Sequence, residues 1–271
     1  MRAIAALGAA LLLAASPGPP AHRIVTLVPS LTEDLFAVGA GAQVVGVSAY
    51  SGDVPGAANL PVVGDFSSVD TEKIVTLRPD LVLGIPPQRR LVEQLRRAGY
   101  DVVLVPDDSY ADIFRDLTVA GDLSGHQQAA AELVARLEAQ TKAMQAQTRA
   151  FKHHPSVFVA LGTGPIWTVG GQSYIAKLIE IAGGVNAAAD LHAAYGEYSA
   201  EALLRDQPDV IVTDPGVHLD SVLGAEPWRS LRAVQAHRVY VVDPAALLER
   251  PGPHYVEGLH WLVDRLRPLA Q

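Results

Sequence analysis

Residues 124–151, SGHQQAAAELVARLEAQTKAMQAQTRAF, form a proline-free segment rich in alanine, glutamine, glutamate, arginine and leucine. Ser124 can cap a helix at its start, and Leu133 and Leu137 recur at helical spacing. About 27 helical residues span roughly 40 Å at 1.5 Å per residue, which is longer than most helices of a globular domain. We therefore predict one long linking helix over residues 124–154.

On either side of this segment, the chain alternates short β-branched runs with helical patterns. Arg23–Val28 is such a run before the segment, and Val157–Leu161 and Val239–Val242 are runs after it. This alternation predicts α/β layers with mostly parallel strands. A chain of 271 residues suits two lobes with separate cores, which we place at residues 22–123 and 155–271.

A local pattern occurs once in each half. Glu72 lies seven residues before the sequence PDLVL, and Glu201 lies seven residues before PDVIV. Both patterns indicate a short helix, a Pro-Asp turn and a buried strand, and the other elements keep the same order in both halves. We therefore predict two similar lobes that face each other across a largely preformed cleft. Open α/β sheets usually bind ligands at the carboxyl ends of their strands, where this cleft would lie.

The first residues predict export. Arg2 precedes the apolar run Ala3–Ala15, which is too short to span a bilayer and is followed by the break SPGPP, so residues 1–21 read as a signal peptide. The chain contains no cysteine, and we therefore expect a protein without a lipid anchor, soluble in a bacterial periplasm. A formal net charge of −8 without a basic run argues against a nucleic-acid partner.

Four stretches resemble a known family. RIVTLVPSLTE at residues 23–33 is similar to the opening of the helical-backbone periplasmic binding proteins, which carry cobalamin, haem and ferric siderophores. VGVSAYS at 45–51, LPVVGDF at 60–66 and RPDLVL at 78–83 are similar to the motifs that follow it. The resemblance implies a monomeric substrate-binding protein of an ABC importer. Such a protein delivers a small molecule to a permease–ATPase complex in the inner membrane, and is neither an enzyme nor the carrier of a resident cofactor.

Within this family the chain is most similar to the cobalamin-binding branch, which implies a cobalt corrinoid held edge-on by aromatic side chains. Tyr50 matches a pocket tyrosine, and Phe66 and Tyr195 fall where the branch has tryptophans. Trp167 falls at a phenylalanine of the branch, and its Gly-Pro-rich surroundings suit a ligand platform better than core packing. Two positions depart from the branch, because aliphatic side chains replace aromatic ones. The implied ligand-binding residues are Tyr50, Phe66, Ile85, Trp167, Tyr195 and Leu248, of which Ile85 and Leu248 are the departures.

The resemblance also implies an acidic residue on the outer surface of each lobe that meets arginines of the permease. Glu72 and Glu201 fall at these positions, and both belong to the repeated pattern. Two carboxylates placed alike on two lobes suit docking onto a symmetric permease dimer, where charge complementarity sets register. Alternatively, each is an ordinary first-turn glutamate favoured by the helix dipole.

Two other functions stay open. The same fold could carry haem, with His192, Tyr195 or Tyr50 as an iron ligand, or a ferric siderophore held by arginines. An α/β metal-dependent enzyme would need converging acid–base pairs or metal ligands. The sequence has no Gly-Lys-Ser/Thr phosphate loop, no Gly-x-Ser-x-Gly elbow and no cysteine, and no third ligand accompanies its histidine pairs.

Overall fold

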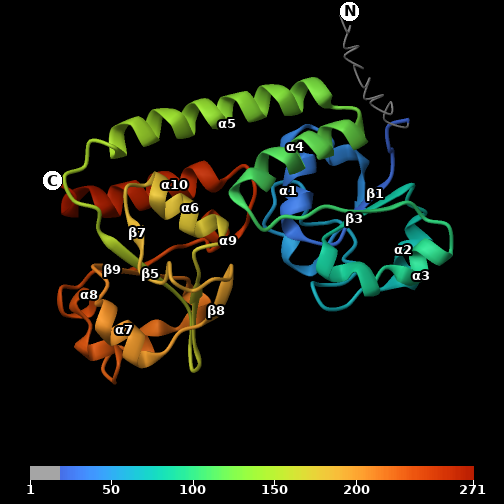
Figure 1. Cartoon of the computed structure of the whole chain (residues 1–271). Coiled ribbons are helices and arrows are strands. Elements are labelled where there is room, and N and C mark those ends of the chain that lie inside the picture. Colours follow the sequence, from blue (N-terminus) through green and yellow to red (C-terminus); the bar gives the residue numbers. More distant parts are fainter. Residues whose placement is uncertain (1–18) are drawn as a thin grey trace, which may run out of the picture.

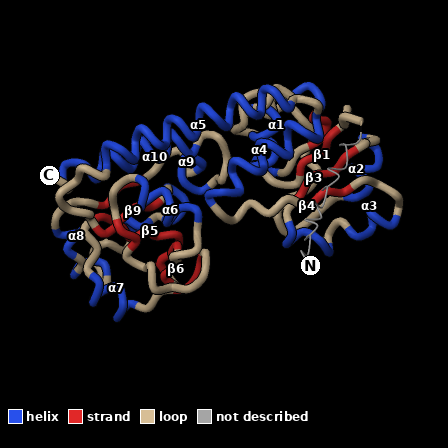
Figure 2. The backbone as a smooth tube through the Cα atoms, turned by 45° about the horizontal axis from the view of Figure 1, so that its top comes forward, coloured by secondary structure: helices blue, strands red, loops and turns tan. Residues whose placement is uncertain are grey.

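The computed structural model describes residues 19–271, so the predicted signal peptide lies almost entirely outside the described residues. Two α/β lobes lie side by side along the helix α5 (Gln127–Thr148), as Figure 1 shows. The two sheets lie at opposite ends of the molecule (Figure 2). Among the helices of residues 19–271, none combines the length and apolarity needed to cross a membrane.

The N-terminal lobe is built on a four-stranded parallel sheet of order β2-β1-β3-β4. Its central strands consist of apolar residues and one threonine, all buried, as a parallel sheet covered on both faces requires. The first helix begins at Pro29, whose fixed φ suits an N-terminal turn. Within this helix, the Thr32 hydroxyl shares a 2.7 Å hydrogen bond with that of Thr26. The elements are β1 (Ile24–Thr26), α1 (Pro29–Ala37), β2 (Val44–Gly46), α2 (Thr71–Leu77), β3 (Leu81–Gly84), α3 (Glu93–Arg97), β4 (Val102–Leu104) and α4 (Tyr110–Ser124).

The C-terminal lobe contains a mixed sheet of order β10-β9-β5-β6-β8, with β7 also paired to β5. Strands β10, β9, β5 and β7 pair in parallel, whereas β6 is antiparallel to both β5 and β8. This lobe therefore contains an inserted hairpin, formed by β5 and β6, that the N-terminal lobe lacks. The elements are β5 (Ser156–Thr163), β6 (Ile166–Val169), α6 (Tyr174–Ile181), β7 (Val185–Asn186), β8 (Tyr195–Glu197), α7 (Ala200–Asp206), β9 (Val210–Thr213), α8 (Arg232–Gln235), β10 (Val239–Val241), α9 (Ala246–Glu249) and α10 (Tyr255–Leu266).

The linking helix is continuous but shorter than the predicted segment. Ser124 does not cap it, because this residue ends α4 and Gly125 then turns the chain in the left-handed region at φ 80°. α5 has 22 residues, and about 33 Å of helix follows from 1.5 Å per residue. Its buried positions, which include Leu133, Leu137 and Met144, lie along one face, and the helix packs against α4, α6 and α10.

The repeated Pro-Asp pattern has the same structure in both lobes. α2 ends in the left-handed residue Arg78 (φ 48°), and α7 ends in the left-handed residue Gln207 (φ 44°). In each lobe, the aspartate two residues after this left-handed residue then ties the turn to the first strand. Asp80 accepts the two backbone N–H groups before β1 at 2.8 and 2.9 Å, and Asp209 accepts the first N–H of β5 at 2.9 Å. The repeat is therefore an actual structural equivalence of the two lobes.

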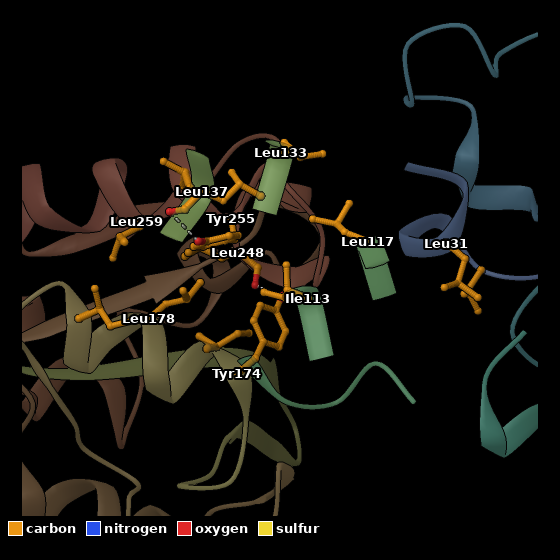
Figure 3. Packing of buried hydrophobic residues seen from close by; sticks show 14 of the residues in the cluster. Leu31, Ile113, Leu117, Leu133, Leu137, Tyr174, Leu178, Leu248, Tyr255 and Leu259 are labelled. Atoms are coloured by element: carbon orange, nitrogen blue, oxygen red, sulfur yellow. Dashed lines mark hydrogen bonds between the residues drawn. The ribbon is translucent and has the colours of Figure 1, made fainter. Parts of the chain in front are cut away.

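The prediction of separate cores is only half right. Each lobe has an inner cluster beneath its sheet, formed by residues such as Ile74 and Val82 in one lobe and Phe158 and Trp228 in the other. A third and larger cluster runs without interruption from one lobe to the other beneath the long helices. Figure 3 shows part of it, with Leu31, Ile113, Leu117, Leu133, Leu137, Tyr174, Leu178, Leu248, Tyr255 and Leu259. Any closing motion would have to shear this shared packing.

Candidate functional site

A cleft of about 850 Å³ lies between the lobes. On the N-terminal side, Val28 and Ile85 line it directly after strands β1 and β3, so it opens at the carboxyl ends of parallel strands. On the C-terminal side, Tyr195 of β8 and the segment 244–251 line it. The cleft therefore has the position that the two-lobed architecture predicts.

Three aromatic side chains rim this cleft, and each is held by local structure. Tyr50 is 72% exposed and follows the buried Ser48, whose hydroxyl bonds Ser51 at 2.8 Å. Phe66 is 58% exposed, in a turn where Asp65 accepts the backbone N–H groups of the next two serines at 2.8 and 2.7 Å. Tyr195, on β8, is 38% exposed. Large apolar surfaces left open on a rigid frame are typical of a ligand site.

Trp167 was predicted to line the same cleft, and the structure does not place it there. It lies on β6 in a neighbouring groove of about 570 Å³, together with Pro165 and Asp214. Because Trp167 pairs with Glu197 and Val169 with Tyr195, the two aromatic side chains project from the same face of the hairpin as diagonal neighbours. The β5–β6 hairpin thus carries Trp167 beyond the cleft, and a ligand would have to extend past Tyr195 to reach it.

Two further predicted positions are also corrected. Leu248 does not line the cleft, because it is 1% exposed and its carbonyl accepts the Tyr174 hydroxyl within the shared core. In the short helix α9, the cleft is lined by Ala246 and Glu249, and the core-facing Leu248 points elsewhere. His192 is exposed and is not among the residues that line the cleft, so a metal-ligating role has no structural support. Ile85, in contrast, does line it.

An ionic seam joins the lobes beside the cleft, and sequence reasoning missed it. Arg250 contacts Glu33 at 3.2 Å and Asp53 at 2.8 Å, both in the opposite lobe. Nδ1 of His254 lies 2.5 Å from the same Glu33 carboxylate, and this hydrogen bond is the main reason that the pKa of His254 is raised. Glu33 and Arg250 are 217 residues apart, so no local pattern could reveal the pair.

Four carboxyl groups, of which Asp107 and Glu249 line the cleft, have raised pKa values. Burial raises the pKa of Asp107 to about 6 and that of Asp116 to about 7. Glu249 opens onto the cleft, yet the surrounding walls exclude enough water to raise its pKa to about 7, with a further contribution from Asp214. Asp34 is fully buried with its pKa raised by burial, and neither carboxyl oxygen has a hydrogen-bond partner within residues 19–271. No three histidine, aspartate or glutamate side chains of that range form a metal-binding group.

The two glutamates of the repeat lie outside the cleft. Glu72 and Glu201 are both exposed and both occupy the first turn of a short helix, α2 in one lobe and α7 in the other. Since these helices are equivalent, the two carboxylates stand at matching points on the two lobes. This placement fits either a docking pair or two ordinary helix-start acids.

Known proteins resemble this chain over most of its length. An uncharacterised ABC transporter substrate-binding lipoprotein of Bacillus subtilis, YvrC, is 33% identical over 91% of this chain and 80% of its own. The crystal structure of the vitamin B12-binding protein BtuF of Vibrio cholerae matches with a TM-score of 0.79 and 27% identity, covering 92% of this chain and 98% of that one. The periplasmic haem-binding protein RhuT of Roseiflexus matches with a TM-score of 0.83 and 27% identity, covering 92% and 99%.

The first of these relatives corrects the predicted localisation. The sequence led us to expect a freely soluble periplasmic protein, and that expectation depended on the absence of cysteine. The Bacillus subtilis relative, which matches 91% of the chain, is a lipoprotein. This finding contradicts the expectation of a freely soluble protein.

Fold, cleft and sequence similarity agree on the type of protein. The BtuF and RhuT matches, both above 25% identity, cover the two lobes and the helix between them. A family model for periplasmic binding proteins matches residues 24–246, which is most of the described chain. The chain belongs to the periplasmic binding protein family.

Proposed function

We propose that the protein is the substrate-binding component of an ABC importer and that its cargo is a corrinoid of the cobalamin type. It would bind this cargo without chemical turnover and pass it to a membrane permease. Two observations from relatives support the proposal: a substrate-binding lipoprotein of an ABC transporter and vitamin B12-binding proteins both match about nine-tenths of the chain.

The observation that carries the cargo proposal is the aromatic rim of the cleft. Tyr50 and Phe66 from one lobe and Tyr195 from the other border a space of about 850 Å³. A flat macrocycle that buries about 400 Å² of apolar surface there would gain roughly 10 kcal/mol before the costs of ordering. A dissociation constant of 1 µM corresponds to about 8 kcal/mol, so submicromolar binding to a preformed cleft is within reach.

Isothermal titration calorimetry with cyanocobalamin tests the cargo directly. We expect saturable binding near one molecule per chain at about 20 µM protein, well above the expected dissociation constant. The Tyr50→Ala/Phe66→Ala double variant removes two of the three rim aromatics and should weaken binding, whereas Trp261→Ala, on α10 away from the cleft, provides the matched aromatic control. Absence of heat with the folded wild-type protein would refute a corrinoid cargo.

Haem is the second candidate, favoured by the hydroxyl groups of Tyr50 and Tyr195 at the cleft and by the similarity to RhuT. Haemin titration would then shift and sharpen the Soret band, and Tyr50→Phe or Tyr195→Phe would abolish that change. A ferric siderophore has less support. An anionic cargo of this kind needs arginines, yet Arg89 and Arg90 do not line the cleft and Arg250 is paired with carboxylates.

We also propose that Glu72 and Glu201 dock the two lobes onto the permease. Their equivalent, exposed positions on α2 and α7 support this role. The charge reversals Glu72→Lys and Glu201→Lys should each reduce uptake of the cargo in cells without changing its affinity for the isolated protein. Glu132→Lys, on the exposed side of α5, is the control. Unimpaired uptake in the double reversal would identify the two residues as ordinary helix-start acids.

A further inference from the structure

The charged side chains that line the cleft are strongly biased towards acids. Within residues 19–271, this lining contains four carboxylates and one guanidinium: Asp53, Asp107, Asp108, Glu249 and Arg250. An anionic cargo group would need the guanidinium or a free helix N-terminus to bind. Both of these features exist at the cleft, and carboxylates of the protein lie against both.

Both terminal nitrogens of Arg250 already have partners within the protein. One of its terminal nitrogens donates to Glu33 at 3.2 Å, and the other contacts both oxygens of Asp53 at 2.8 and 2.9 Å and the Tyr50 carbonyl at 3.4 Å. Only 14% of its side chain is exposed. A cargo carboxylate could bind Arg250 only by displacing one of these partners, and removal of the partner from Glu33 would leave a buried charge.

A carboxylate also lies against the N-terminus of α1. Its first residues, Pro29 and Ser30, line the cleft, and a helix of nine residues directs a partial positive charge there. Pro29 contributes no N–H, however, and the Ser30 hydroxyl donates to Asp107 at 2.9 Å. Asp107 therefore stands where a carboxylate of the cargo would otherwise bind.

Two of the four acids line the cleft from opposite sides, Asp107 from the N-terminal lobe and Glu249 from the C-terminal lobe. Tyr195 lines the same cleft, where burial and then the negative charges of Asp107, Asp108 and Glu249 raise its pKa. Above neutral pH, a ring bound beside Tyr195 would have a carboxylate near its edge from either side. Groups that donate hydrogen bonds are stabilised in that field, and further carboxylates are repelled.

We propose that Asp107 and Glu249 determine which charge class of macrocycle the protein accepts: they receive hydrogen bonds from N–H donors, such as the peripheral amides of an uncharged ring, and reject the same ring when it carries carboxylates. This selectivity rests on the proposed function of the cleft as a macrocycle site. It adds to that function a chemical criterion by which corrinoid amides are admitted and polycarboxylate rings excluded.

A pair of matched ligands tests the proposal. Dicyanocobinamide carries amides around the corrin ring, and dicyanocobyrinic acid carries carboxylates at the same positions. At pH 8 we expect the wild-type protein to bind the amide ring at least 100-fold more tightly, which is about 2.7 kcal/mol at tenfold per 1.4 kcal/mol. Asp107→Asn/Glu249→Gln should reduce this ratio to below about fivefold, chiefly by tightening the acid ring. Each single variant should give an intermediate ratio, which keeps the test informative if the double variant does not fold.

The control variant is Glu132→Gln/Asp264→Asn, which changes the net charge equally on exposed faces of α5 and α10. It should leave the ratio unchanged. Equal affinity of the wild-type protein for the two rings, or full discrimination retained in the cleft variant, would overturn the proposal and leave a corrinoid cargo in place. Failure to bind dicyanocobinamide and cyanocobalamin would refute the corrinoid cargo instead. Haemin and its dimethyl ester then replace the pair, and preference for the ester would still support the charge criterion.

Discussion

The two lobes share one frame and differ in what they attach to it. Each has a short helix that ends in a left-handed residue, a proline, and an aspartate, Asp80 or Asp209, that binds the first strand. The C-terminal lobe adds the β5–β6 hairpin with Trp167. At the seam, the N-terminal lobe supplies the acids and the C-terminal lobe supplies the bases. The repeated frame thus builds the fold. The features that differ between the lobes, the hairpin and the two sides of the ionic seam, lie next to the cleft.

Loss of the seam should have the largest effect. Arg250→Ala leaves Glu33, whose side chain is 4% exposed, without its guanidinium, and we expect a loss of about 3 kcal/mol in the free energy of unfolding. Urea denaturation measures this loss. Arg250→Lys keeps one positive charge and should lose less than half as much. A loss below about 1 kcal/mol for the alanine variant would show that the lobes are joined by the shared core alone.

Ligand affinity should depend more on the aromatic rim of the cleft than on the neighbouring groove. Tyr50→Ala removes a rim aromatic of the cleft and should weaken binding of the cargo about tenfold, the equivalent of 1.4 kcal/mol. Trp167→Ala alters only the groove beyond Tyr195, and we expect an effect below about threefold. Calorimetry with cyanocobalamin compares the two. A larger effect at Trp167 would mean that the cargo extends across both hollows.

Matched substitutions should show how alike the two frames are. Asp80→Ala and Asp209→Ala each remove a carboxylate that accepts backbone N–H groups at the start of a lobe's first strand. Each should cost about 1 kcal/mol of stability, as typical hydrogen bonds do. Thermal unfolding checks this, with Glu132→Ala as the surface control. A more than threefold difference between the two losses of stability would mean that the turns have the same structure but contribute unequally to stability.

The smallest effect should come from His254 and should depend on pH. Its pKa is raised by Glu33, so the protonated form is stabilised in the folded protein. This contribution is complete below the unfolded pKa of about 6.5 and is lost as the pH rises through the folded value. His254→Gln should therefore lower the melting temperature more at pH 5.5 than at pH 9. The exposed His153→Gln is the control, and a pH-independent difference would contradict the charged pair.

The sequence predicted the parts of the structure that depend on local pattern. Absence of proline and the spacing of Leu133 and Leu137 indicated the long helix, and the two Pro-Asp patterns indicated equivalent lobes. The break at Gly125 was missed, because an isolated glycine inside a helical pattern is often tolerated. The shared core was missed too, since the apolar faces of α4, α5 and α10 reveal their burial but not their partners.

The site was predicted less completely than the fold. Tyr50, Phe66, Ile85 and Tyr195 do line the cleft: Ile85 follows β3, Tyr195 begins β8, and Tyr50 and Phe66 lie between β2 and α2. Leu248 failed because one turn of α9 decides which side chains face inward. Trp167 failed because the pairing of β6 with β8 fixes how far along the sheet it lies. The ionic seam joins residues about 200 positions apart, and only the tertiary fold brings them together.

The core that runs through both lobes should affect how loaded and unloaded copies compete for the transporter. Because closure would have to shear that core, we expect Glu72 and Glu201 to keep a nearly constant separation whether the cleft is filled or vacant. With the proposed docking, an unloaded copy would present the same footprint as a loaded one and compete with it for every encounter. The transporter would then have to sense occupancy at the mouth of the cleft, and uptake would slow when the receptor greatly outnumbers its cargo.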